Sequence, residues 1–172
     1  MKPALVVLIC ATLLVVSASM YFSRAVRSEA GRIRLLPVLR PVMRLMNPRT
    51  IRAVERQQST FGVLHHVGRR SGVEYRTPVA AARTSDGVLV PLMYGLRTDW
   101  CRNILTAGHC TLTFDGEELA LAVPQVVGAA IAEPRLPTRT LQRWQGQGIE
   151  HYLSMKHASP VEIGAAPAAP VV

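Results

Sequence analysis

The chain has 172 residues and a formal net charge of +9 at pH 7. That length suits one ordinary domain, and the charge favours an anionic partner such as membrane lipids or an anionic cofactor or substrate. Aromatic residues make up only 5% of the chain and none lies within a basic run, so we expect no nucleic-acid partner. Three scattered cysteines provide no disulfide framework, which agrees with a reducing compartment.

The amino-terminal stretch has the pattern of a membrane anchor. Residues 3–23 contain no charged side chain, and a helix of roughly 20 apolar residues crosses the hydrocarbon core of a bilayer. We expect a transmembrane helix over residues 1–23. A cleaved signal peptide is the alternative, because residues 17–19 resemble a cleavage site. The arginines that follow place the rest of this single-pass cell-membrane protein on the cytoplasmic side.

Residues 24–56 are predicted to form a basic amphipathic helical collar. Apolar positions such as Ile33 and Leu36 alternate with arginines in a roughly helical period. Pro37 and Pro41 should break or kink the helix. The collar is expected to lie along the membrane interface, where arginines attract anionic lipids, or to cover one end of the following sheet. Both arrangements can hold at once.

Residues 57–158 have the pattern of a domain of short strands. Turn signals at 68–72, 85–87 and 115–116 separate the predicted strands 61–67, 75–83, 88–93, 110–114 and 117–123, and a further short element covers 149–155. Helices are expected over 100–107, ended by Gly108, and over 138–145. The segment 124–137 should be mostly loop, and the Ala/Pro-rich tail 159–172 disordered. The sum is an α+β protein built on a small antiparallel β-barrel or a strongly curved sheet.

The turn over residues 68–72 is the strongest candidate for a binding site. Its glycines allow close approach to a ligand, and the main-chain N–H groups of such a turn can bind an anion. Arg69 and Arg70 add guanidinium groups suited to phosphate or carboxylate, Ser71 adds a hydroxyl, and Arg76 can return to the same site across the hairpin. A basic, solvated turn explains these residues equally well from their chemistry alone.

A second candidate site covers residues 94–103. Tyr94 and Gly95 lead into a helix that carries Trp100 in its first turn and Asn103 three residues later on the same face. The N-terminus of that helix offers free N–H groups to an anion. A core tryptophan behind an ordinary helix cap is the alternative.

No metal site and no catalytic triad is predicted. His65 and His66 are neighbours in a strand and should point to opposite faces, which makes joint metal binding difficult. Cys101, His109 and Cys110 lack a recognised zinc spacing. If the protein is an enzyme, an organic cofactor should carry the chemistry.

The two candidate segments together resemble a known family. The runs HHVGRRSGVEYRTPV and VPLMYGLRTDWCRNILTAG, followed by a DG hairpin and PQVV, are similar to the deazaflavin-dependent nitroreductases of actinobacteria over roughly residues 28–157. The resemblance implies a split β-barrel of the flavin-binding type that binds the deazaflavin coenzyme F420. It also implies hydride transfer between the reduced coenzyme and a hydrophobic acceptor, either quinone-like or nitroaromatic.

The resemblance also implies roles for individual residues. The phosphate and glutamate tail of the coenzyme would lie on the loop of Arg70, Ser71 and Gly72, with Arg69, Arg76, Thr77 and Pro78 as further cofactor-binding candidates. Met93, Tyr94 and Gly95 would approach the deazaflavin ring, and Trp100 and Asn103 would close the site. Trp144 and Tyr152 would shape the substrate pocket.

Two other functions and one assembly stay open at this point. The same barrel could bind flavin mononucleotide (FMN) and act as a flavin oxidoreductase. It could instead be a membrane-tethered cofactor-binding module without catalytic activity. The protein could also form a homodimer.

Overall fold

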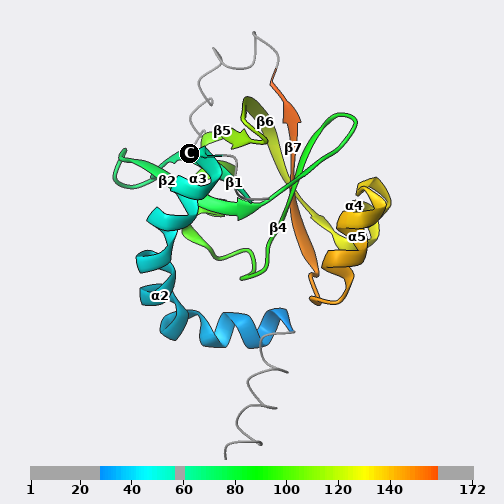
Figure 1. Ribbon diagram of the computed structural model, residues 1–172, viewed down its shortest axis with the longest axis horizontal. Coiled ribbons are helices and arrows are strands. Elements are labelled where there is room, and N and C mark those ends of the chain that lie inside the picture. The colour runs from blue at the N-terminus through cyan, green and yellow to red at the C-terminus, as the bar shows by residue number, and fades with distance from the viewer. Residues whose placement is uncertain (1–27, 57–60, 159–172) are drawn as a thin grey trace, which may run out of the picture.

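The computed structural model describes residues 28–56 and 61–158, in which a curled antiparallel sheet carries flanking helices (Figure 1). The protein is therefore an α+β protein, and the sheet has the form of a half-barrel. Over these residues, no helix is both long and apolar enough to cross a bilayer. The predicted anchor, residues 1–23, and the predicted tail, residues 159–172, lie outside the described residues.

The described residues form seven strands, four α-helices and one 3-10 helix. The strands are β1 (Phe61–Val67), β2 (Glu74–Ala80), β3 (Ala82–Arg83), β4 (Gly87–Pro91), β5 (His109–Phe114), β6 (Glu117–Gly128) and β7 (His151–His157). The helices are α2 (Glu29–Glu55), α3 (Asp99–Ala107), α4 (Ala129–Ala132), the short 3-10 helix η1 (Glu133–Arg135) and α5 (Thr138–Gln145). The order of strands across the sheet is β2-β1-β5-β6-β7-β4-β3, and every pair of neighbours is antiparallel.

The predicted single strand over 75–83 is wrong in one respect. The segment forms β2 and β3, which lie at opposite edges of the sheet although only Ala81 separates them in the chain. The sheet must curl for one residue to connect its two edges, and this curl produces the half-barrel. Alanine is not a turn residue, so the sequence carries no signal for the break.

The sheet buries side chains on both of its faces. Val88 and Val90 of β4 belong to a core that also contains Ile104 of α3, whereas Leu89 between them packs into a second core beside α5. Successive side chains of a strand point to opposite faces, so a strand covered on both sides is an unbroken apolar run. This explains why all five residues of β4 are buried.

The predicted loop over 124–137 is also wrong. Strand β6 continues through Pro124 to Gly128, and the chain then forms α4 and η1. The pairing of β6 with β7 shifts register between Ala122 and Gln125, where Val123 adopts a positive φ of 53°. A bulge of this kind tolerates a proline, which cannot donate to a regular ladder.

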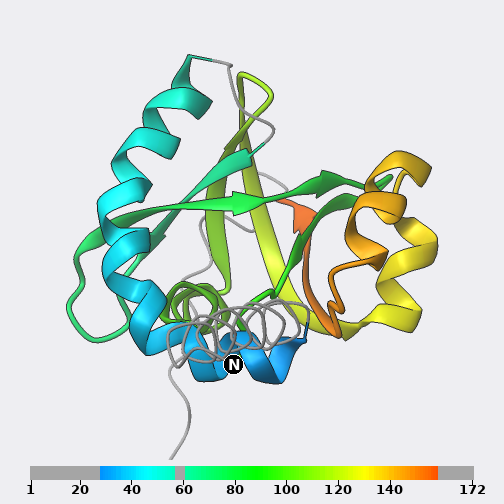
Figure 2. The same cartoon turned by 60° about the horizontal axis from the view of Figure 1, so that its bottom comes forward.

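Helix α2 runs past the sheet as an arm with a bend that is visible in Figures 1 and 2. Prolines 37, 41 and 48 lie inside it, and each removes one helical hydrogen bond. The helix begins at Ser28, whose hydroxyl accepts a hydrogen bond from the N–H of Gly31 at 3.1 Å. The sequence predicts a helix over residues 24–56 that is kinked at prolines, and α2 agrees with this prediction over the described residues.

Arg32 fixes the start of α2 to the rest of the protein. Its side chain is 3% exposed, and its guanidinium donates to the main-chain carbonyls of Met93, Gln147 and Gly148. The last two contacts measure 2.6 and 3.1 Å. One buried cation therefore connects α2 to the loop after β4 and to the loop before β7.

Candidate functional site

A cavity of about 820 Å³ lies between α2, the β1–β2 hairpin and the segment that joins β4 to α3. Its volume is within the range of sites for small molecules and cofactors. Its lining combines apolar and aromatic side chains with residues of the loop over 68–72. The lining includes Leu36, Met43, Asn47, Thr50, His66, Gly68, Arg70, Ser71, Arg76, Thr77, Pro78, Met93, Tyr94, Thr98, Asp99, Trp100 and Asn103.

Helix α2 forms one wall of the cavity. Leu36, Met43, Asn47 and Thr50 line the cavity and recur at helical spacing, so they share one face of the helix. Only a helix held close to the sheet can form such a wall. The three hydrogen bonds of the Arg32 guanidinium provide that attachment, one helical turn before Leu36.

The hairpin loop over 68–72 has a closed main-chain structure. The N–H of Gly68 donates to the carbonyl of Val73 and the N–H of Gly72 donates to the carbonyl of Gly68, both at 2.8 Å. A Cβ at Gly68 would lie 2.5 Å from Ser71 Oγ and 2.7 Å from Tyr75 Cε2, so a larger residue there would displace both side chains. Gly72 has a φ of 66°, which also favours glycine.

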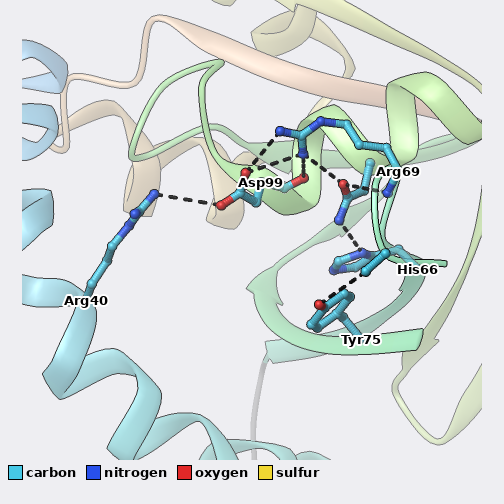
Figure 3. Close-up of polar contacts among 7 residues, drawn as sticks. Arg40, His66, Arg69, Tyr75 and Asp99 are labelled. Atoms are coloured by element: carbon cyan, nitrogen blue, oxygen red, sulfur yellow. Dashed lines mark hydrogen bonds and ion pairs between the residues drawn. The ribbon is translucent and has the colours of Figure 1, made fainter. Parts of the chain in front are cut away.

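Arg69 belongs to a network of polar side chains beside this loop (Figure 3). Its guanidinium donates to Asn103 Oδ1 at 2.9 Å and to Asp99 Oδ1 at 3.3 Å, and Arg40 approaches Asp99 at 3.8 Å. Asp99 is largely exposed, and exposed ion pairs contribute only about 0–1 kcal/mol. The buried amide of Asn103 therefore has the larger structural role.

Asn103 fixes the tautomer of His66. Its Oδ1 accepts from both the main-chain N–H and the guanidinium of Arg69, so its Nδ2 must donate to His66 Nδ1 at 3.2 Å. His66 Nε2 then carries the proton and donates to Thr77 Oγ1 at 3.0 Å. Burial, with a smaller effect of His65, lowers the pKa of His66 to about 4. The imidazole is neutral at physiological pH.

The segment between β4 and α3 supplies the aromatic part of the cavity. Met93, Tyr94 and Trp100 line it, and burial raises the pKa of the Tyr94 phenol, which therefore stays protonated at neutral pH. Thr98, just before α3, also lines the cavity. Its Oγ1 is buried and has no hydrogen-bond partner among the described residues.

The structure brings most of the sequence-predicted cofactor residues to this cavity. Nine line it: Arg70, Ser71, Arg76, Thr77, Pro78, Met93, Tyr94, Trp100 and Asn103. Arg69, Gly72 and Gly95 are not among the lining residues. Arg70 forms no ion pair or side-chain hydrogen bond within the described residues, whereas Arg76 pairs with Glu55 of α2 and through a hydrogen bond lowers the pKa of that carboxyl.

The two predicted substrate-pocket residues lie elsewhere. Trp144 and Tyr152 pack together in the second core, with ring centroids 6.0 Å apart, and neither lines the cavity. Tyr152 is fully buried. Their role as pocket residues is therefore not supported by their position, because they fill the space between the sheet and α5.

Sequence reasoning missed Arg32, His66 and Asp99 as parts of the site. Arg32 is one of many arginines in its segment, and no local pattern separates a buried one from the rest. His66 and Asp99 meet their partners across 11 to 37 residues of chain. Contacts of that kind depend on the fold and leave no signal in a single sequence.

The described residues contain no group of three or more His, Cys, Asp or Glu side chains that could hold a metal ion. Burial raises the pKa of the Cys101 thiol to about 11 and that of Cys110 to about 12. Both are thiols at neutral pH and are poor nucleophiles. Neither cysteine is among the lining residues of the cavity.

The known proteins that resemble the chain do so at low sequence identity. No family model and no curated protein matches the chain. A crystal structure of Atu2129 from Agrobacterium tumefaciens str. C58, a protein of unknown function, is similar with 16% identity and a TM-score of 0.42, over 67% of this chain and 59% of that one. A second solved structure is 14% identical with a TM-score of 0.36, over 64% of this chain and 80% of the other. The chain thus spans under two thirds of the length of Atu2129.

Proposed function

We propose that this protein is an oxidoreductase that uses the deazaflavin coenzyme F420 to transfer hydride to a hydrophobic, quinone-like or nitroaromatic acceptor. The observation that carries this function is the mixed lining of the cavity. Met93, Tyr94 and Trp100 line it together with the unpaired Arg70 and Ser71 of the loop. A cofactor with a flat ring and an anionic tail would use both kinds of side chain.

Specific atoms of the cavity fit such a cofactor. Arg70 and Ser71, on a loop kept tight by Gly68, suit a phosphate or carboxylate of the tail. When bound, the reduced coenzyme supplies the hydride.

The residues of the chain would position the reactants and exclude water. Leu36 and Met43 of α2 cover the cavity with apolar surface. His66 stays neutral and, through its Nε2–H, leaves the hydroxyl hydrogen of Thr77 free to donate. Hydride transfer depends on the geometry of the reactants and on the exclusion of water, and it needs no dedicated general acid or base. A cavity without an acid–base pair among the described residues is compatible with this reaction.

Titration of coenzyme F420 into the full chain in mild detergent tests this function, with the anisotropy of the coenzyme's own fluorescence as the signal. We expect saturable binding that Arg70→Ala weakens about tenfold, because one charge-assisted contact to the tail is lost. Arg139→Ala is the matched control, since Arg139 is exposed on α5 and does not line the cavity. No saturable binding, or equal weakening by both changes, contradicts the assignment.

Two parallel measurements separate the alternatives. Tight binding of flavin mononucleotide with weak binding of coenzyme F420 would replace the proposed cofactor. Binding of reduced coenzyme without oxidation by any menaquinone or nitroaromatic would favour a non-catalytic cofactor-binding module.

A further inference from the structure

The outer face of α2 is an exposed apolar stripe. Val38, Val42 and Leu45 are 72%, 54% and 69% exposed, and Met46 beside them is half exposed. Three of these recur at positions i, i+4 and i+7, so they share one face of the helix. Monomeric proteins rarely expose large aliphatic side chains in contiguous groups, and such groups commonly mark an interaction surface.

This stripe is distinct from the face that serves the fold. Leu36, Met43, Asn47 and Thr50 line the cavity, and Val54 is buried at the end of the same face. The exposed stripe is offset from these residues by about half a helical turn. Figure 2 shows α2 along the outside of the molecule, so the stripe faces away from the sheet.

The charges around the stripe are positive. Arg34 precedes it on the same face, and Arg49, Arg52 and Arg56 follow it; all four are exposed and none forms a side-chain salt bridge among the described residues. Glu55, which lies between Arg52 and Arg56 in the sequence, pairs with Arg76 and also interacts electrostatically with Arg52. The surface therefore joins aliphatic side chains to an excess of positive charge.

We propose that this face of α2 docks on the surface of an anionic lipid bilayer, with Val38, Val42 and Leu45 among the headgroups and the four arginines on lipid phosphates and carboxylates. A helix with these two properties suits the interface plane of a membrane. A second copy of the chain is a poorer occupant, since a symmetric contact would bring the arginines of both molecules together. Residues 3–23, which precede α2 and carry no charge, favour lipid over an acidic protein.

Docking in this way would place the cavity close to the membrane. The opposite face of the same helix lines the cavity, and a helix is about 10 Å in diameter. A lipid-dissolved molecule would then have a short route to the cavity. The docking surface itself does not depend on which ligand the cavity binds.

Depth-dependent fluorescence quenching of the full chain in vesicles tests the docking. Cys10→Ser removes one thiol, and the buried Cys101 and Cys110 resist labelling, so Leu45→Cys provides a single labelling site. Gln142→Cys, on the exposed surface of α5, is the matched control. Each labelled protein is reconstituted in phosphatidylcholine vesicles with and without phosphatidylserine, and the lipids carry a nitroxide quencher near the headgroup.

We expect strong quenching of the Leu45 label with phosphatidylserine, weaker quenching without it, and little at Gln142. Arg49→Gln should lower the ratio of docked to undocked label about fivefold, and high salt should act in the same direction. A Leu45 label as unquenched as the Gln142 label in phosphatidylserine vesicles overturns the proposal. If quenching of the Leu45 label does not depend on lipid charge and two Leu45→Cys chains form a disulfide cross-link, the face contacts a second copy of the chain. That result also overturns the proposal. Val38→Cys repeats the measurement if the first variant misfolds.

Discussion

Lowering the pH from about 7 to about 5 should destabilise the folded protein through His66. In the folded state the ring is buried, Asn103 donates to Nδ1 and Thr77 accepts from Nε2–H, so only the neutral form satisfies both bonds. Burial holds the pKa of His66 at about 4, against about 6.5 for a free histidine. The unfolded chain therefore binds more protons within this window, and stability must fall as pH falls.

The size of the effect follows from the two pKa values. The stabilisation is fully present above pH 6.5 and decreases toward pH 4. At pH 5 the linkage amounts to about 2 kcal/mol, and the full shift corresponds to about 3 kcal/mol. Glu55 and Asp86, whose pKa values are lowered by hydrogen bonds from Arg76 and Arg135, take up protons below this window. The change between pH 7 and 5 therefore reports mainly on His66 among these three groups.

Urea unfolding of the full chain in non-ionic detergent, followed by tryptophan fluorescence at several pH values, measures this slope. His66→Gln should flatten it between pH 7 and 5, whatever its effect on absolute stability. His109→Gln, which changes an exposed histidine at the start of β5, should leave the slope as it is. An identical slope in wild type and His66→Gln would refute the assignment of a neutral, hydrogen-bonded His66.

Two substitutions test the structure around the site. Arg32→Met should lower the free energy of unfolding by about 3 kcal/mol or more, because three main-chain carbonyls lose their hydrogen-bond donor. Arg34→Met, on the exposed face of α2, is the control and should change the free energy of unfolding by less than about 0.5 kcal/mol. Thermal unfolding of the two variants measures the difference. Gly87→Ala should prevent correct pairing of β4 and β7, since the added Cβ would lie 1.9 Å from the carbonyl oxygen of Met155, whereas Gly128→Ala meets nothing within 4 Å and should fold normally by circular dichroism.

Local sequence signals predicted much of the fold. Strand β1 and helix α5 have the predicted bounds, and α3 begins one residue earlier than predicted. Gly108 ends α3 in the left-handed conformation, with a φ of 78° and its N–H on the carbonyl of Ile104. These features depend on periodicity and on turn chemistry, which a single sequence contains.

Features that depend on distant parts of the chain were not predictable. Pro124 has the pattern of a strand end, but β6 continues past it because β6 itself bulges there, with Val123 and Pro124 opposite Met155 of β7. Arg69 looks like a ligand-binding arginine, but Asp99 and Asn103 bind it from α3. Arg70, its neighbour in the same motif, has no such partner among the described residues, and only the fold distinguishes the two.

The arrangement of the sheet's two edges has a consequence for association between molecules. Exposed edge strands are templates for pairing with another chain, and proteins reduce this hazard with very short edge strands or with a covering helix. Here β3 has only two residues, and α2 packs beside β2, where Arg76 pairs with Glu55. Within residues 28–56 and 61–158, the sheet has no long uncovered edge strand with which a neighbouring molecule could pair. Aggregation by edge-to-edge pairing is disfavoured, and a dimer would have to form through another surface.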